Sequence, residues 1–163
     1  MTENPLFPEN HNKETPKSLK IVLAEDDVDD VFVFELAIKE LNIKVDLNHV
    51  NDGEKLLNLL KHFLPDMIFL DIDMPCKDGI ACIVEIRKNR DLDNVPVIMI
   101  SSHINSKYID DSYSNGANYY LIKANSVKQL SESLNKIFII DWKKIVYFPT
   151  KDKFVINHTK GVA

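Results

Sequence analysis

Short apolar runs that end abruptly in acidic side chains recur in this sequence and limit the folds it can adopt. The two clearest runs, residues 19–24 and 67–70, are followed at once by the acids Glu25, Asp26, Asp27, Asp71 and Asp73. Runs without an alternating polar face are typical of parallel strands buried on both sides. We therefore expect a parallel sheet covered by helices on both faces.

Further strands and helices complete this pattern. The remaining strand candidates span residues 43–50, 96–100 and 119–122. Apolar residues at helical spacing mark residues 28–41, 80–86, 106–115 and 127–138, and another helix follows Asp52, a side chain suited to capping it. Strands that alternate with helices imply right-handed crossovers. The expected α/β fold is a flavodoxin-like, doubly wound, five-stranded parallel sheet of strand order 2-1-3-4-5, with helices on both faces.

Length and composition bound the remaining possibilities. The 163 residues suit one domain, which we place at 19–140, after a flexible leader at 1–18 and before a C-terminal extension at 141–163. The extension is too short for a separate output domain. Its aromatic residues Trp142, Tyr147 and Phe148 are expected to continue the last helix or to pack back on the domain rather than to form a partner motif. The net charge of −5 argues against nucleic acid as a direct partner. The sequence shows no signal peptide or membrane span, and two cysteines without a zinc spacing suit the cytoplasm.

Polar residues follow four of the expected strands. Glu25 and Asp26 follow the first strand, Asp71 the third, Ser101 the fourth and Lys123 the fifth. Binding sites in doubly wound sheets lie at this carboxyl edge, beside the point where the strand order reverses. Each residue alone would be ordinary turn or surface chemistry. Their occurrence together, in strand order, predicts a single site.

The expected cluster of carboxylates has a specific chemistry. Crowded carboxylates repel one another, and a divalent cation relieves that repulsion. Oxygen ligands without histidine or cysteine favour Mg²⁺ over zinc. A carboxylate beside Mg²⁺, here Asp71, can attack a phosphoryl group and form an aspartyl phosphate. Lys123 would neutralise the charge of that group and Ser101 would hydrogen-bond one of its oxygens.

Several motifs lie at or beside these strand ends. They are Glu25-Asp26-Asp27, the segment 69–75 with Asp78-Gly79 after it, the strand from Pro96 to Ser101-Ser102, and Gly116-Ala117 leading to Tyr120-Leu121-Ile122-Lys123. As a set they resemble the receiver domain of bacterial two-component response regulators. The resemblance spans about residues 19–140 and implies the fold described above.

The resemblance also implies a role for each residue of the site. Asp71 would accept a phosphoryl group from a histidine kinase or a histidine phosphotransfer protein. Asp26 and Asp71 would bind Mg²⁺ through their side chains, Glu25 would act through a bound water, and Asp73 would contribute its backbone carbonyl. Lys123 would pair with the phosphoryl group.

Two more residues would form the switch that the resemblance implies. Ser101 would turn inward to bond the phosphoryl group, and Tyr120 would follow from outside to inside. This change would reorganise the face built from the fourth helix, the fifth strand and the fifth helix. An unknown downstream protein, or a second copy in a homodimer, would bind that face.

The sequence departs from the family's pattern after the lysine. Ala124 stands where the family often has proline, and a cis peptide at Lys123–Ala124 would cost about 3 kcal/mol. The isomer of this peptide is therefore open. Asp73 and His103 lie where their side chains can flank the phosphoryl group.

Two other functions compete with a phosphorylated, single-domain response regulator. One is a pseudo-receiver, a binding module that is never phosphorylated. The other is a haloacid-dehalogenase-like phosphatase, because Asp71-Ile72-Asp73 has the form of that family's DxD motif. That family places its motif after the first strand, whereas here two strand–helix units precede it. We expect no enzyme activity beyond phosphoryl transfer to and from Asp71.

Overall fold

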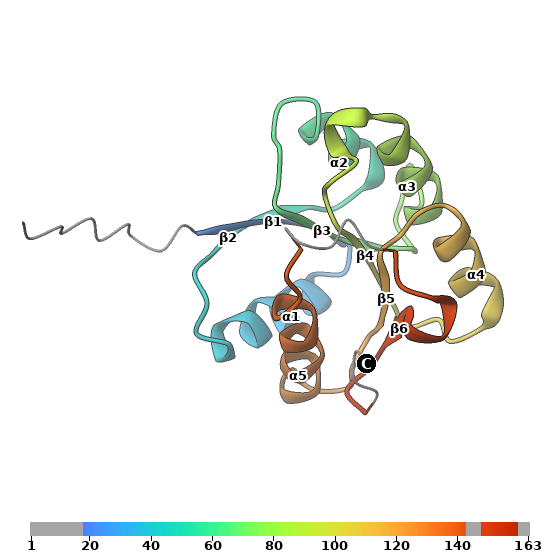
Figure 1. Cartoon of the computed structure of the whole chain (residues 1–163). Helices are drawn as coiled ribbons and strands as arrows, with labels where there is room; N and C mark the ends of the chain where they lie inside the picture. The colour runs from blue at the N-terminus through green and yellow to red at the C-terminus, as the bar shows by residue number, and fades with distance from the viewer. Residues whose placement is uncertain (1–17, 143–147, 160–163) are drawn as a thin grey trace, which may run out of the picture.

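A six-stranded parallel sheet forms the centre of the protein in a computed structural model that describes residues 18–142 and 148–159 (Figure 1). The strands are β1 (Leu19–Ala24), β2 (Val45–Val50), β3 (Met67–Asp71), β4 (Val97–Ser101), β5 (Tyr119–Ile122) and β6 (Val155–Ile156). The α-helices are α1 (Val28–Glu40), α2 (Gly53–Leu59), α3 (Gly79–Lys88), α4 (Ser106–Ser114) and α5 (Val127–Phe138). Two short 3₁₀ helices are η1 (Arg90–Leu92) and η2 (Lys151–Lys153).

The strand order is β2-β1-β3-β4-β5-β6, and every neighbouring pair is parallel. The predicted doubly wound sheet is therefore confirmed, with one strand added at its edge. The order reverses between β1 and β3, because the chain adds β2 on one side of β1 and all later strands on the other. This reversal is the point beside which a site was expected.

Apolar layers cover both faces of the sheet. Helices α1 and α5 lie on one face, and α2, α3 and α4 lie on the other (Figure 1). Along β3, Phe69 packs toward α1 and α5 while Ile68 and Leu70 pack toward the opposite layer. Phe69 meets Phe34 of α1 edge-to-face, with ring centroids 4.9 Å apart. Burial on both sides explains why β3 and β4 carry no polar residue before they end, whereas the edge strand β2 is only partly buried and carries polar residues.

Each α-helix starts at a side chain that accepts hydrogen bonds from its first turn. The caps are Asp27, Asp52, Asp78, Asn105 and Ser126. The predicted cap at Asp52 is thus confirmed. Since α1 begins immediately after its cap, the chain turns sharply at the end of β1 and keeps the acids there at the edge of the sheet.

The C-terminal extension contributes strand β6, which the sequence analysis did not predict. Val155 and Ile156 pair with Tyr120 and Leu121 of β5. The strand has only two residues, so it carries no periodic pattern by which a sequence could reveal it. The preceding Phe154, which the sequence analysis did not single out, is fully buried, whereas Phe148, one of the aromatic residues considered there, is half exposed.

Trp142 also packs back, edge-to-face on Tyr119 with ring centroids 5.9 Å apart. Tyr147 and residues 1–17 of the predicted leader lie outside the described residues. Among the described helices, none combines the length and apolar character that crossing a bilayer requires.

Gly79, the first residue of α3, allows the helix to start against the end of β3. A Cβ at this position would collide with the backbone carbonyl oxygen of Asp71. Gly79→Ala must therefore move the backbone at Asp71, and we expect it to lower the free energy of unfolding by about 2 kcal/mol. Urea denaturation followed by circular dichroism would measure this change.

The matched control is Glu85→Ala on the same helix, at a side chain that is 42% exposed. We expect this control to change stability by less than about 0.5 kcal/mol. Equal midpoints for Gly79→Ala and Glu85→Ala would contradict the close approach of α3 to Asp71.

Candidate functional site

Three carboxylates meet at the carboxyl edge of the sheet. Glu25 and Asp26 follow β1, and Asp71 ends β3, the strand paired with β1. One carboxylate oxygen from each residue lies within 4.8 Å of the others. Glu25 and Asp71 are buried, whereas Asp26 is exposed. The structure therefore brings together the three acids that the strand pattern placed at one edge.

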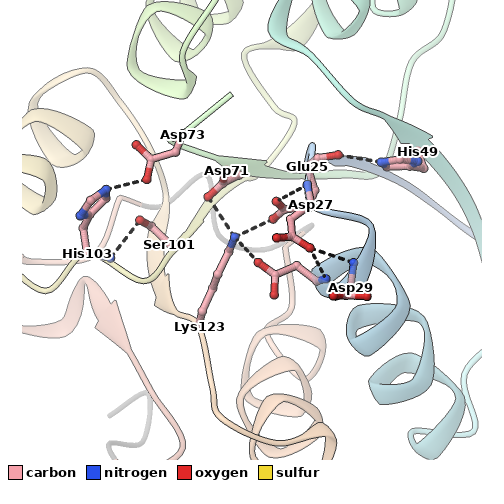
Figure 2. A network of polar contacts seen from close by, with 10 residues as sticks. Glu25, Asp27, Asp29, His49, Asp71, Asp73, Ser101, His103 and Lys123 are labelled. Atoms are coloured by element: carbon pink, nitrogen blue, oxygen red, sulfur yellow. Dashed lines mark hydrogen bonds and ion pairs between the residues drawn. The ribbon is translucent and has the colours of Figure 1, made fainter. Parts of the chain in front are cut away.

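Lys123, which follows β5, reaches into this cluster from the other side of the site (Figure 2). Its Nζ lies 2.8 Å from Glu25 Oε2 and 3.3 Å from Asp71 Oδ1. Its backbone N–H donates to the Ser101 carbonyl at 2.9 Å, which continues the β4–β5 ladder. The ammonium is thus held at the acids by a short and well-anchored segment.

Asp30 is a third partner of Lys123, and the sequence analysis missed it. Its Oδ2 lies 2.7 Å from Lys123 Nζ. Asp30 lies in the first turn of α1, where the favourable interaction of an acid with the helix dipole is already a sufficient reason for its presence. Only the placement of α1 beside the end of β5 reveals the ion pair.

Burial and ion pairing oppose each other in this cluster. Burial raises the pKa of Glu25 to about 7, although the hydrogen bond from Lys123 limits the rise. Burial likewise raises the pKa of Asp71, and the charge of Lys123 opposes it. For Lys123, burial alone would lower the pKa, but hydrogen bonds to Asp30 and Glu25 raise it above its usual value. The cluster therefore favours any further positive charge that reaches it.

The donor set fits a hard divalent cation. All three members of the cluster offer carboxylate oxygens, without nitrogen or sulfur ligands among them. Ions such as Mg²⁺ take such ligands, whereas zinc prefers histidine and cysteine. Asp26, the exposed member, gives solvent access to the cluster.

Ser101 and Tyr120 form a second group beside Asp71. Ser101 Oγ is fully buried and accepts a hydrogen bond from the His103 backbone N–H at 3.1 Å. The Tyr120 hydroxyl donates to the His103 carbonyl at 2.9 Å. Burial raises the pKa of Tyr120, and a hydrogen bond with the Ser101 hydroxyl opposes the rise. Tyr120 therefore lies in the inward arrangement, joined to Ser101 through His103.

Asp73 points away from the carboxylate cluster and toward His103 (Figure 2). Its Oδ2 lies 2.6 Å from His103 Nε2, and the His103 ring stacks on Tyr108 with centroids 4.3 Å apart. The sequence analysis placed both side chains beside the phosphoryl position but did not predict that they pair. Because this side chain is engaged with His103, a metal contact from Asp73 would have to use its backbone carbonyl.

The peptide between Lys123 and Ala124 is trans, since the described residues contain no cis peptide bond. The structure therefore assigns the trans isomer to the Lys123–Ala124 peptide, which the sequence left open. Lys123 reaches the acids from this backbone without a proline after it.

Lys123→Met tests the balance of charge in the cluster. Without the ammonium, the buried Glu25 and Asp71 lose a partner, so we expect the free energy of unfolding to fall by about 3 kcal/mol without divalent cations. The same change removes a competing charge, so Mg²⁺ affinity at pH 8 should rise about tenfold or more. Urea denaturation with and without Mg²⁺, and calorimetric titration, would measure both effects.

Lys128→Met, an exposed position on α5, serves as the control for loss of one positive charge. We expect its stability and Mg²⁺ affinity to match the wild type. A Lys123→Met protein with unchanged Mg²⁺ affinity would show that the ammonium does not compete for the acids.

A family model described as the response regulator receiver domain matches residues 21–135. Response regulator Rcp1 of Synechocystis sp. is 29% identical over 136 residues, which cover 79% of this chain and 92% of that protein. Chemotaxis protein CheY-3 of Vibrio cholerae is 30% identical over 125 residues, which cover 75% of this chain and 93% of that protein.

Solved structures give the same result. The crystal structure of the phosphorylated cyanobacterial phytochrome response regulator RcpA aligns with a TM-score of 0.69 and 29% identity, covering 74% of this chain and 91% of RcpA. The crystal structure of the Mn²⁺-bound form of Rcp1 aligns with a TM-score of 0.68 and 28% identity, covering 81% and 99% of the two chains. Because the family model spans most of the chain and the fold agrees, this chain belongs to the response regulator receiver domain family.

Proposed function

We propose that this receiver domain is a cytoplasmic switch, phosphorylated on Asp71 by a histidine kinase or a histidine phosphotransfer protein with Mg²⁺. One observation carries the proposal. The buried Asp71 carboxylate lies within 4.8 Å of two other carboxylates and 3.3 Å from the Lys123 ammonium. A nucleophilic carboxylate, a cation site and a fixed positive charge thus lie together, as acylphosphate formation requires.

The acids of the cluster would hold the metal. Asp26 and Asp71 would bind Mg²⁺ through their side chains, Glu25 through a water, and Asp73 through its backbone carbonyl. The ion would neutralise charge on the phosphoryl oxygens. The Mn²⁺-bound form of Rcp1 and the phosphorylated form of RcpA, both similar to this chain, support these two parts of the proposal.

The transfer itself needs only a few groups of this chain. An Asp71 carboxylate oxygen attacks phosphorus while the bond from phosphorus to the donor's histidine nitrogen breaks, and that nitrogen keeps the electron pair. Lys123 can turn its ammonium from Asp71 to a phosphoryl oxygen without leaving the cluster. The Ser101 hydroxyl can donate to another.

Hydrolysis of the acylphosphate by water would restore the Asp71 carboxylate and release inorganic phosphate. The domain would therefore act on no external substrate and would not be an enzyme beyond this self-catalysed transfer. The output would be contacts with a downstream protein. A homodimer through α4, β5 and α5 stays a prediction.

Incubation with acetyl phosphate and Mg²⁺ tests the assignment of Asp71. We expect intact-mass spectrometry to find one added phosphoryl group on the wild type, lost when Mg²⁺ is chelated. Asp71→Asn should take up less than about a hundredth as much, because its amide is a poor nucleophile. Asp46→Asn, at an exposed aspartate of β2 away from the carboxyl edge of the sheet, is the matched control and should still be labelled.

Equal labelling of the wild type and Asp71→Asn would refute Asp71 as the acceptor. A wild type that takes up no phosphoryl group from acetyl phosphate, and none from a panel of phosphorylated kinases, would favour the pseudo-receiver. Turnover of a generic phosphoester with Mg²⁺ would favour the phosphatase.

A further inference from the structure

Residues 148–159, here called the C-terminal cover, lie against the face formed by α4, β5 and α5 (Figure 1). They contain η2 and β6. Strand β6 occupies the edge of β5 that would otherwise be open. The face expected to bind a partner is therefore already occupied, by the chain itself.

The backbone of the cover pairs with β5, the strand that carries Tyr120. The Tyr120 backbone N–H donates to the Phe154 carbonyl at 2.9 Å. Val155 and Ile156 lie opposite Tyr120 and Leu121 in the parallel ladder. Tyr120 therefore carries both the side chain that reaches toward Ser101 and the amide that holds the cover.

Phe154 is the anchor of the cover. It is 0% exposed, and its ring lies 5.1 Å from that of Tyr113 on α4 and 6.3 Å from that of Tyr120. Tyr120 is also 0% exposed. Since both rings are buried and in contact, a rotation of Tyr120 out of its present position would change its packing on Phe154.

Polar contacts tie the cover to both flanking helices. Lys151 Nζ lies 2.8 Å from Asp110 Oδ1 on α4. Lys136 Nζ, on α5, donates to the carbonyls of Asn157 and His158 at 2.8 and 3.1 Å. The cover thus bridges the two helices that border β5.

A continuous series of contacts joins the cover to the phosphorylation site. Ser101 follows Ile100, the residue opposite Asp71 in the β3–β4 ladder, and its Oγ accepts from the His103 N–H. The His103 carbonyl accepts from the Tyr120 hydroxyl, and the Tyr120 ring packs against Phe154. Any change that fixes Ser101 inward therefore favours the arrangement in which Tyr120 is inward.

We propose that the C-terminal cover is an intramolecular partner of the switch, bound through Phe154 and Tyr120 and held more tightly when Asp71 is phosphorylated. The inference rests on the proposed function, since it needs a phosphoryl group on Asp71. A phosphoryl group that accepts the Ser101 hydroxyl hydrogen would hold Ser101 inward, where its Oγ accepts from the His103 N–H and the His103 carbonyl accepts from the Tyr120 hydroxyl. This is the arrangement in which the cover is docked. By linkage, the docked cover must strengthen phosphoryl binding by the same factor.

The coupling determines how an outside protein can use this face. A partner that needs the edge of β5 must displace the cover, which phosphorylation would make harder. A partner that recognises β6 and η2 together with α4 would bind better after phosphorylation. Phosphorylation thus selects between partners according to whether they need the cover present or absent.

Beryllofluoride, which mimics a phosphoryl group on a carboxylate, provides the test with the full chain. In the wild type with Mg²⁺, we expect it to slow hydrogen exchange of the Tyr120 and Ile156 amides, which face each other's strands, about fivefold or more. Asp71→Asn should not respond. This measurement needs no variant of the cover and therefore does not depend on the folding of one.

The reciprocal arm measures beryllofluoride affinity by fluorine NMR. Phe154→Ala should weaken binding about fivefold or more, whereas Phe148→Ala, a half-exposed phenylalanine in the same cover, should bind as the wild type does. Light scattering on the same samples shows whether the cover is docked within one copy or exchanged between two. Dimers that form in the wild type and are lost in Phe154→Ala would overturn the proposal that the cover docks within one copy.

The outcomes separate this inference from the proposed function. The coupling is overturned if the wild type binds beryllofluoride without a change in amide exchange at β6 and Phe154→Ala binds it with the same affinity. That result leaves the phosphorylation switch standing. Wild type that does not bind beryllofluoride at all overturns both.

Discussion

One ammonium group opposes the charge of the acids at the edge of the sheet. Lys123 Nζ lies within 3.3 Å of carboxylate oxygens of Glu25, Asp30 and Asp71. Withdrawing a carboxylate from water costs several kcal/mol, and the partner must offset that cost. The acids still outnumber the lysine, so the cluster retains negative charge that a divalent cation can neutralise. If Asp71 carried a phosphoryl group, the Lys123 ammonium would move from the Asp71 carboxylate to a phosphoryl oxygen. The site around it would already be organised.

Much of this arrangement could be predicted because it follows from local rules. A strand buried on both faces has no polar residue until it ends, so the first polar residues mark the carboxyl edge. Parallel strands place all their carboxyl ends together, which brings Glu25 and Asp71 side by side. The pairing of Asp30 with Lys123 could not be predicted in this way. It joins residues 93 positions apart and depends on where α1 packs, which no short segment specifies.

Strand β6 was missed for a related reason. Its two residues have no period, and its stability comes from contacts rather than from β-propensity. Phe154 packs between Tyr113 of α4 and Tyr120 of β5, two residues that lie far from it in the sequence. An isolated aromatic residue in a polar tail indicates burial somewhere, but only the tertiary structure shows against what.

These contacts also decide where coupling between Asp71 and the C-terminal cover can reside. A ligand shifts an equilibrium only through contacts that differ between its two states. The ion pair between Lys151 and Asp110 joins side chains that are 59% and 45% exposed, so it contributes little energy and little difference. The contact of Phe154 with Tyr120 joins two side chains that are fully buried, and in this structure Tyr120 is inward. If the proposed coupling exists, most of it would therefore reside in the packing of Phe154 on Tyr120, and salt would change it little.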